Sequence, residues 1–378
     1  MQVGEFLAWI DRASAERRAD AARALARVYL NTEVDADTRN AMEAAMTILL
    51  DDPSTDVRIG LADVLGASAA APRHIVISLA VDQPAVAELV LARSPLLIDA
   101  ELVDIAAAAP LALQVAIASR PRVSSAVAAA LAEVGERDAC RALLDNPQAA
   151  VARISMKRIA ERFGDEADLR AVLLERADCP ADVHQMLIRR LGDALGSMMV
   201  VKSWAGEARA ATVTRDACDR ATVALAAETE SEELPALVEH LRVTGQLTTA
   251  LLLRSVCAGN VAFFEFALSV LARVPLARVV SLVRAGRLNA LRAAYSRAGL
   301  PALAFDAFAA ALDTWRQLGE EGETDRYRAT LRMVDAVLTR YARITDNEAH
   351  ELATMLRRFA ADQARDAARD YARTARAA

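Results

Sequence analysis

Aromatic residues are sparse in this sequence, and no segment shows the sustained alternation of apolar and polar residues that is typical of a strand. Phe, Trp and Tyr make up only 4% of the 378 residues, although 54% of the residues are hydrophobic. Alanine and leucine therefore supply most of the apolar fraction, and both favour helix over strand. The composition predicts an all-α protein with no sheet.

Lysine is almost absent, since Lys157 and Lys202 are the only two, and arginine supplies nearly all of the positive charge. The formal net charge of the chain is −6. A protein whose main task is to bind phosphate groups usually has an excess of basic residues. The acidic balance therefore argues against nucleic-acid binding as the principal function.

Cysteine is too rare in this chain to form a disulfide scaffold, and no C-x-x-C motif is present. The four cysteines follow one another at an even spacing of 39 residues, but the residues that flank them do not stay in phase: Cys140, Cys179, Cys218 and Cys257. We therefore attribute the even spacing to coincidence and not to a repeat.

Long hydrophobic runs are lacking as well. The apolar stretch 105–118 is interrupted by Pro110 and Gln114, and it is too short to span a membrane. Residues 1–20 carry charges throughout and lack the apolar core of a signal peptide. We therefore expect a cytoplasmic protein without a membrane partner.

What the sequence does contain is a recurring corner motif. It reads Leu-Leu-Asp-Asp-Pro at 49–53 and Leu-Leu-Asp-Asn-Pro at 143–147, with looser copies elsewhere. Proline in the first turn of a helix forfeits no intrahelical hydrogen bond, and a preceding Asp or Asn can cap the helix. We therefore expect five prolines to lie within the first turn of a helix or one residue before it: Pro53, Pro84, Pro110, Pro147 and Pro180.

Two of these units align without a gap at an offset of 26 residues, PAVAELVLARSP at 84–95 and PLALQVAIASRP at 110–121. A period near 30 suits two short helices and their turns, which bury their apolar faces only by stacking on neighbouring pairs. The pattern predicts an α-solenoid, a superhelix of helical repeats. The residues expected in its cores are Val57, Leu61, Leu65, Leu89, Val115, Ile154 and Ile159.

The segment Asp-Val-Arg-x-x-Leu-Ala-x-x-Leu at 56–65 resembles the opening of a HEAT-type or leucine-rich-variant repeat. The wider pattern, over roughly residues 40–315, resembles an uncharacterised bacterial family that is classed as a domain of unknown function. Its later segments are matched by 237–242, 251–254, Gly259-Asn260 with Phe263-Phe264, and 297–301. The resemblance implies a fold of HEAT-like repeats and brings no catalytic residues with it.

Four parts are predicted along the chain: an N-terminal repeat array at 1–195, a helical connector at 196–232, a C-terminal repeat array at 233–345 and a C-terminal helix at 346–378. The connector is interpreted as a long helix with one solvated face, with a hinge as the alternative. The last helix has an apolar stripe (Leu352, Met355, Leu356 and Phe359) followed by Asp/Arg pairs at i,i+3 spacing. It is either a solvated terminus or an arm for docking or self-association.

No group of residues has the spacing of a catalytic or metal site. His350-Glu351 lacks the second histidine one turn further on that a zincin helix needs. The segment 192–197 lacks the lysine of a phosphate-binding loop. Cys179, Asp182 and His184 are close in sequence, but a cysteine before a corner proline is best explained by packing. We predict no catalytic residue, no metal and no cofactor.

Basic side chains recur at similar helix positions and form the candidate interaction surface: Arg58, Arg93, Arg120, Arg153, Lys157, Arg189 and Arg190. By analogy with other helical repeats, the predicted function is a non-catalytic scaffold that binds another, unknown protein. The alternative is nucleic-acid binding on an architecture like that of HEAT-like DNA glycosylases. Such a protein needs a basic stripe with aromatics, whereas Trp9, Trp204 and Trp315 are scattered.

Overall fold

The computed structural model describes residues 9–10, 12–198, 206–322, 325–341, 353–362 and 364–365. Helix accounts for 76% of the described residues, which contain no strand beyond an isolated bridge between Val123 and Ala149. The predicted all-α fold is therefore confirmed. Several residues named above lie outside the described ranges: Lys202, Trp204, His350, Glu351 and Leu352.

The chain divides into two compact units, Met1–Cys179 and Pro180–Ala378. The predicted first array ends later, at residue 195, so that it includes a helix that belongs to the second unit. The predicted connector is also part of the second unit, because its helix packs along the preceding one. Each unit is described by itself below.

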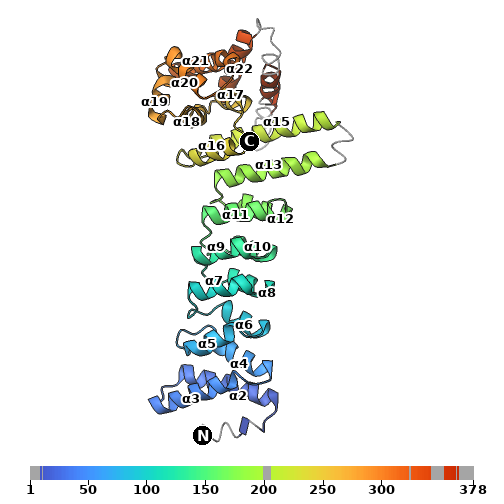
Figure 1. The fold of residues 1–378 in the computed structure, drawn as a ribbon, viewed down its shortest axis with the longest axis vertical. Helices are drawn as coiled ribbons and strands as arrows, with labels where there is room; N and C mark the ends of the chain where they lie inside the picture. The colour runs from blue at the N-terminus through green and yellow to red at the C-terminus, as the bar shows by residue number, and fades with distance from the viewer. Residues whose placement is uncertain are drawn as a thin grey trace, which may run out of the picture. The chain divides into compact units, whose positions relative to one another are not determined.

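The first unit is a stack of short helices in two columns (Figure 1). In one column α2, α4, α6, α8, α10 and α12 follow one another, and in the other α7, α9 and α11 do so. The bounds are α2 (Ala15–Asn31), α3 (Ala36–Leu49), α4 (Thr55–Leu65), α5 (Arg73–Ala80), α6 (Pro84–Leu91), α7 (Asp99–Ala108), α8 (Leu111–Ala118), α9 (Ser125–Val134), α10 (Arg137–Asp145), α11 (Arg153–Phe163) and α12 (Ala167–Glu175). Each pair buries its apolar face against its neighbours, as helical repeats do.

The period in the middle of this stack is 26 residues. Ser94, Arg120 and Asn146 each follow a helix of the first column and each precede a proline. The bridge from Val123 to Ala149 joins the same corner of two successive repeats, and Ala150 N–H donates to the Val123 carbonyl at 2.9 Å. Successive repeats are therefore in register at their corners.

The proline prediction is confirmed at three positions and wrong at two. Pro84 is the first residue of α6, and Pro110 and Pro180 immediately precede their helices. Pro53 lies two residues before α4, and Pro147 lies in a turn well before α11. All five prolines lie in the described part of the chain, and none of them interrupts a helix.

The two exceptions share one local structure. Asp52 Oδ1 accepts a hydrogen bond from Ser54 N–H at 2.8 Å, and Asn146 Oδ1 accepts one from Gln148 N–H at 2.9 Å. This is an Asx turn, in which the proline occupies the middle position and cannot also start the helix. The two motifs also precede different columns, since α4 belongs to the first and α11 to the second.

The predicted core is confirmed where the repeat pattern is regular. Val57, Leu61, Leu65 and Ile159 are fully buried. Leu89 and Val115 are half-buried. The prediction that Ile154 is buried is wrong, because 75% of its surface is exposed. It is the second residue of α11, whose buried face is formed by Ser155, Met156, Ile159 and Ala160.

The second unit surrounds one apolar core. Phe264 stacks on Phe308 with ring centroids 5.0 Å apart, and Tyr295 meets Phe305 edge-on at 5.2 Å. Its elements are α13 (Ala181–Ser197), α15 (Glu207–Glu228), α16 (Leu234–Val243), α17 (Thr249–Cys257), α18 (Val261–Ala272), α19 (Leu276–Arg284), α20 (Leu288–Arg297), η1 (Ala302–Ala304), α21 (Phe305–Glu321) and α22 (Arg326–Tyr341).

Two glycines let α13 and α15 approach closely. A Cβ atom at Gly192 would lie 2.3 Å from the sulfur of Cys218, and one at Gly196 would lie 3.1 Å from the Thr214 hydroxyl. The Gly-x-x-x-Gly spacing, which lacks the features of a phosphate loop, is therefore a helix-packing seam.

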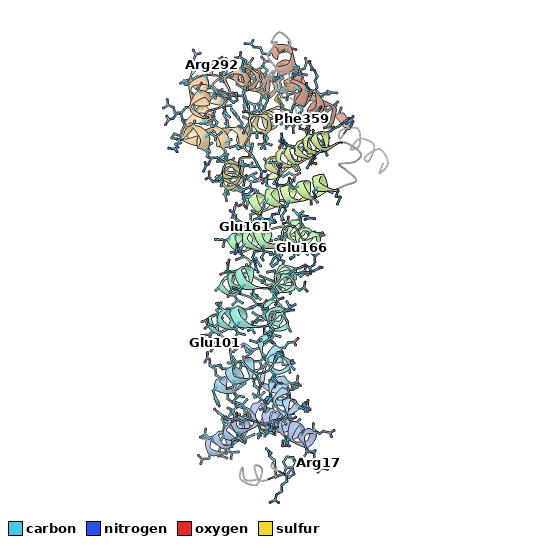
Figure 2. The ribbon with its side chains drawn as sticks, turned by 45° about the vertical axis from the view of Figure 1, so that its right-hand side comes forward. Arg17, Glu101, Glu161, Glu166, Arg292 and Phe359 are labelled. Carbon is cyan, nitrogen blue, oxygen red and sulfur yellow. The ribbon has the colours of Figure 1, made fainter. Side chains whose placement is uncertain are left out.

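The described part of the C-terminal helix packs on the second unit's own core. Leu356 is fully buried and Phe359 is 3% exposed (Figure 2). Asp362 pairs with Arg220 of α15 and, at 3.0 Å, with Arg365. The apolar stripe is thus used within the unit. Self-association through residues 366–378 concerns residues outside the described ranges and stays a prediction.

Replacing Leu61 by alanine is expected to lower the free energy of unfolding by about 2–5 kcal/mol, because it leaves a cavity between stacked helices. Ile154→Ala is the control, since the exposed side chain should cost below about 0.5 kcal/mol. Urea melts of the two variants make the comparison. Similar losses in both would contradict the packing described here.

Candidate functional site

The predicted interaction surface does not come together as one described surface. Arg58, Arg93, Arg120, Arg153 and Lys157 belong to the first unit, whereas the remaining two lie on α13 of the second. Arg153 and Lys157 are partly exposed, as are Arg189 and Arg190. Arg189 pairs with Asp193 one turn further along α13, at 3.5 Å.

Two of the first-unit arginines form ion pairs between repeats. The side chain of Arg58 is 13% exposed, pairs with Asp82 at 2.9 Å and donates to the Asp52 carbonyl at 3.0 Å. Arg93 pairs with Asp63 at 3.1 Å. In each pair the two residues come from successive repeats. For Arg58 and Arg93, the spacing that predicts a binding surface therefore arises from contacts within the stack.

Arg120 is not on the surface at all, because it is only 8% exposed. Its guanidinium donates to the Leu91 carbonyl, at the end of α6, and to the Ser94 carbonyl at 2.6 Å. Burial lowers the pKa of Arg120, against the opposing field of Asp99. The last carbonyls of a helix have no partner within the helix, and Arg120 supplies one from the next repeat.

The same contact recurs along the stack. The Asn146 amide donates to the carbonyls of Ala118 and Arg120 at 2.9 and 2.8 Å, and Arg176 donates to the Leu144 carbonyl at 2.8 Å. We call Arg120, Asn146 and Arg176 the corner ladder. Each member closes the end of a helix in the preceding repeat.

Three of the four thiols, those of Cys140, Cys218 and Cys257, are buried and do not have the properties of nucleophiles. Burial raises the pKa of Cys140 to about 11 and that of Cys257 to about 12, and it also raises the pKa of Cys218. A low pKa and exposure mark a reactive cysteine. Within the described ranges, no three His, Cys, Asp or Glu side chains gather as metal ligands.

A different set of arginines stands out in the second unit. Residues 241–305 contain eight arginines and a single acidic residue, Glu265. Seven of these arginines are exposed, and Arg242 among them pairs with Glu239 one turn earlier on α16. We call the other six the arginine surface; they lie on α19, α20 and the turns before and between these helices: Arg273, Arg278, Arg284, Arg287, Arg292 and Arg297. Sequence reasoning missed this surface, although a local count of charges would have found it.

The arginine surface is largely unpaired. Arg292 pairs with Asp306 at 3.1 Å and lies over the ring of Phe305; it stands at the edge of its unit in Figure 2. The other five form no ion pair with any residue that the structure describes. Glu265 does not neutralise them at the surface, because it is 7% exposed. Burial raises its pKa, and Arg284 opposes that rise.

Helical periodicity places these arginines outside. In α19 the apolar residues Val279, Leu282 and Val283 face the core, and in α20 Leu291 and Tyr295 do so. The turn between the two helices depends on Gly286, which has φ +62°. A Cβ atom there would lie 1.8 Å from Nη1 of Arg316, so that the side chain of this α21 residue lies close to the turn.

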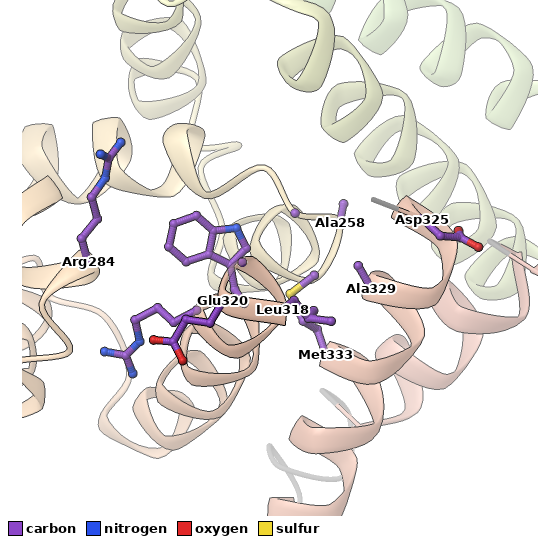
Figure 3. Close-up of a pocket in the computed structure, with 11 residues that line it drawn as sticks. Ala258, Arg284, Leu318, Glu320, Asp325, Ala329 and Met333 are labelled. Carbon is purple, nitrogen blue, oxygen red and sulfur yellow. The ribbon is translucent and has the colours of Figure 1, made fainter. Parts of the chain in front are cut away.

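A cavity of about 470 Å³ adjoins the arginine surface through Arg284 (Figure 3). Its lining comes from the end of α17, from α19, α21 and α22: Ala258, Gly259, Arg284, Trp315, Arg316, Leu318, Gly319, Glu320, Asp325, Ala329 and Met333. This size is within the range of ligand pockets.

A second cleft, of about 880 Å³, surrounds Arg254 of α17. The side chain is 3% exposed and pairs with Asp216 at 2.5 Å and Asp219 at 3.3 Å, both on α15. Burial raises the pKa of Asp219, while Arg254 opposes the rise. Arg358 of the C-terminal helix also reaches Asp216, at 3.6 Å. The cluster ties three helices together, and we interpret it as structural.

These features define an all-α protein of stacked helix pairs with an arginine-rich surface. The chain belongs to DUF2336, described as an uncharacterised protein conserved in bacteria, whose family model matches residues 86–346. The family resemblance seen in the sequence is thus confirmed. No curated protein and no solved structure matches the chain. Among the described helices, none has both the length and the apolar character needed to cross a membrane.

Arg120→Ala is expected to lower the free energy of unfolding by about 1–3 kcal/mol, because it leaves helix-end carbonyls without a partner in a buried corner. Arg122→Ala removes an exposed arginine two residues away and should cost below about 0.5 kcal/mol. Denaturant melts of both variants test this. Equal, small losses would show that Arg120 does not hold the corner.

Glu265→Gln is expected to raise the melting temperature by a few degrees at pH 7.5. Because the folded pKa of Glu265 lies above its unfolded value, the folded state loses stability as pH rises through the unfolded pKa of about 4.3 towards the folded pKa. The gain from the glutamine variant should therefore shrink towards zero near pH 4. Calorimetry across this range measures it.

Glu239→Gln is the matched control, since a hydrogen bond from Arg242 lowers the pKa of this exposed carboxyl. Its replacement should lower the melting temperature slightly at neutral pH, the opposite sign. A Glu265 variant that is less stable than the wild type at pH 7.5 would contradict the reasoning.

Proposed function

We propose that the protein is a non-catalytic interaction protein that binds an acidic region of a partner protein through the arginine surface. The observation that supports this most is the set of five exposed arginines without ion pairs, in a chain whose net charge is −6. The repeats of the first unit, which we take to be HEAT-like, would serve as a scaffold. The four free thiols suit a reducing compartment such as the cytoplasm.

The positive charges of neighbouring arginines repel one another, and an acidic partner relieves that repulsion. Complementary charge also speeds encounter and selects the partner. Arginine is enriched in protein interfaces, whereas lysine is depleted, and residues 241–305 contain no lysine. The composition of the surface therefore fits a protein partner.

Nucleic acid is the alternative occupant of the same surface. Its affinity comes largely from counterions that Lys and Arg release from many phosphates. Residues 1–179 carry 27 acidic and 19 basic residues, so that the first unit would repel an extended polyanion. Arg58, Arg93 and Arg120 are moreover engaged within the stack. These facts favour a protein over a nucleic acid.

The test compares two variants that each lose four exposed arginines without ion pairs to described residues. The surface variant replaces Arg278, Arg284, Arg287 and Arg297 by alanine, and the control replaces Arg12, Arg17, Arg27 and Arg122. The probe is a short fluorescent peptide rich in Glu and Asp, followed by anisotropy at increasing salt. The surface variant should lose about tenfold in affinity, which is about 1.4 kcal/mol, and the control should lose little.

Equal losses in the two variants would show that overall charge, and not the arginine surface, determines binding. A generic DNA duplex is titrated in parallel. Binding of the duplex that is tighter than that of the peptide at physiological salt, with several ions released, would overturn the proposal and favour the alternative.

A further inference from the structure

The cavity beside the arginine surface has two chemically different ends. Arg284 and Glu320 lie at one end, and Leu318, Ala329 and Met333 gather toward the other, where Asp325 lies beyond Ala329 (Figure 3). The half-buried indole of Trp315 also lines the cavity. A large apolar wall beside a few charged groups is typical of a pocket that takes an anchor residue in an interface.

The charges that line the cavity balance one another, with two arginines against Glu320 and Asp325. Arg316 is already engaged, because it pairs with Asp313 at 2.7 Å and contacts the turn at Gly286. A phosphate group inside the cavity would therefore face two carboxylates. The interior suits an uncharged apolar group, whereas the arginine surface at its edge suits carboxylates.

We infer that the cavity receives a large apolar side chain from the partner, flanked by acidic residues that contact the arginine surface. This inference rests on the proposed function and specifies the partner as an acidic segment with an apolar anchor. Arg284 connects the two parts, because it lines the cavity and belongs to the arginine surface. A cavity of about 470 Å³ has room for such a side chain together with adjoining main chain.

The experiment uses two acidic peptides of the same length and charge, one with a central leucine and one with serine in its place. On the full-length protein the leucine peptide should bind about tenfold more tightly, because burying one large apolar side chain contributes roughly this much. The serine peptide reports the arginine surface alone.

The variant Ala329→Phe should fill the cavity from α22 without changing any charge. It should remove the difference between the two peptides and leave the affinity of the serine peptide unchanged. Ala224→Phe, at an exposed alanine of α15 outside the cavity, is the matched control and should preserve the difference. Thermal melts verify that both variants fold.

A second measurement does not depend on Ala329→Phe folding. The leucine peptide should shift the tryptophan emission of the wild-type protein, and the shift should disappear in Trp315→Phe. The serine peptide should cause a much smaller shift.

The outcomes separate the two proposals. Equal affinity for both peptides, with binding still lost in the surface variant, would overturn the inference and leave the proposed function in place. Absence of binding by either peptide would contradict the proposed function itself. Tight binding of a free mononucleotide that Ala329→Phe abolishes would identify a small-anion pocket and overturn the inference.

Discussion

The structure of the first unit depends on how each helix pair completes its neighbour. A stack of short helices has no central core, and every helix ends in carbonyls without intrahelical partners. The corner ladder provides partners at the ends of α6, α8 and α10, because in each case a side chain of the next repeat donates to the helix end of the repeat before it. Since these donors recur at three successive corners, Arg120, Asn146 and Arg176 appear in the sequence at the repeat spacing.

This constraint explains which sequence predictions succeed. Burial of Leu61 and the helix starts at Pro84 and Pro110 follow from local periodicity and from the geometry of proline, which do not depend on the neighbouring repeat. Ile154 shows what local periodicity cannot predict. It lies in the first turn of α11, and which side of that turn is buried depends on the helix that packs against it. Pro147 shows another, since an Asx-Pro pair forms the same turn at two different corners.

The candidate surface was harder to predict for a related reason. An arginine at helical spacing looks the same in the sequence whether it faces solvent or reaches the preceding repeat, as Arg120 does. The net charge hides local imbalance, so that the acidic total obscured the excess of arginine in 241–305. The cavity lined by Arg284 and Trp315 joins residues far apart in the chain, and no motif in the sequence links them.

Two classes of arginine therefore coexist: those that hold repeats together and those that remain free for a partner. An alanine scan that reads both unfolding free energy and affinity for an acidic peptide tests this division most directly. Replacing Arg120 should lower stability and leave affinity nearly unchanged, whereas replacing the exposed Arg278 should weaken binding and leave stability nearly unchanged. A single arginine, in either unit, whose replacement both lowers the free energy of unfolding and weakens peptide binding would contradict the division into two classes.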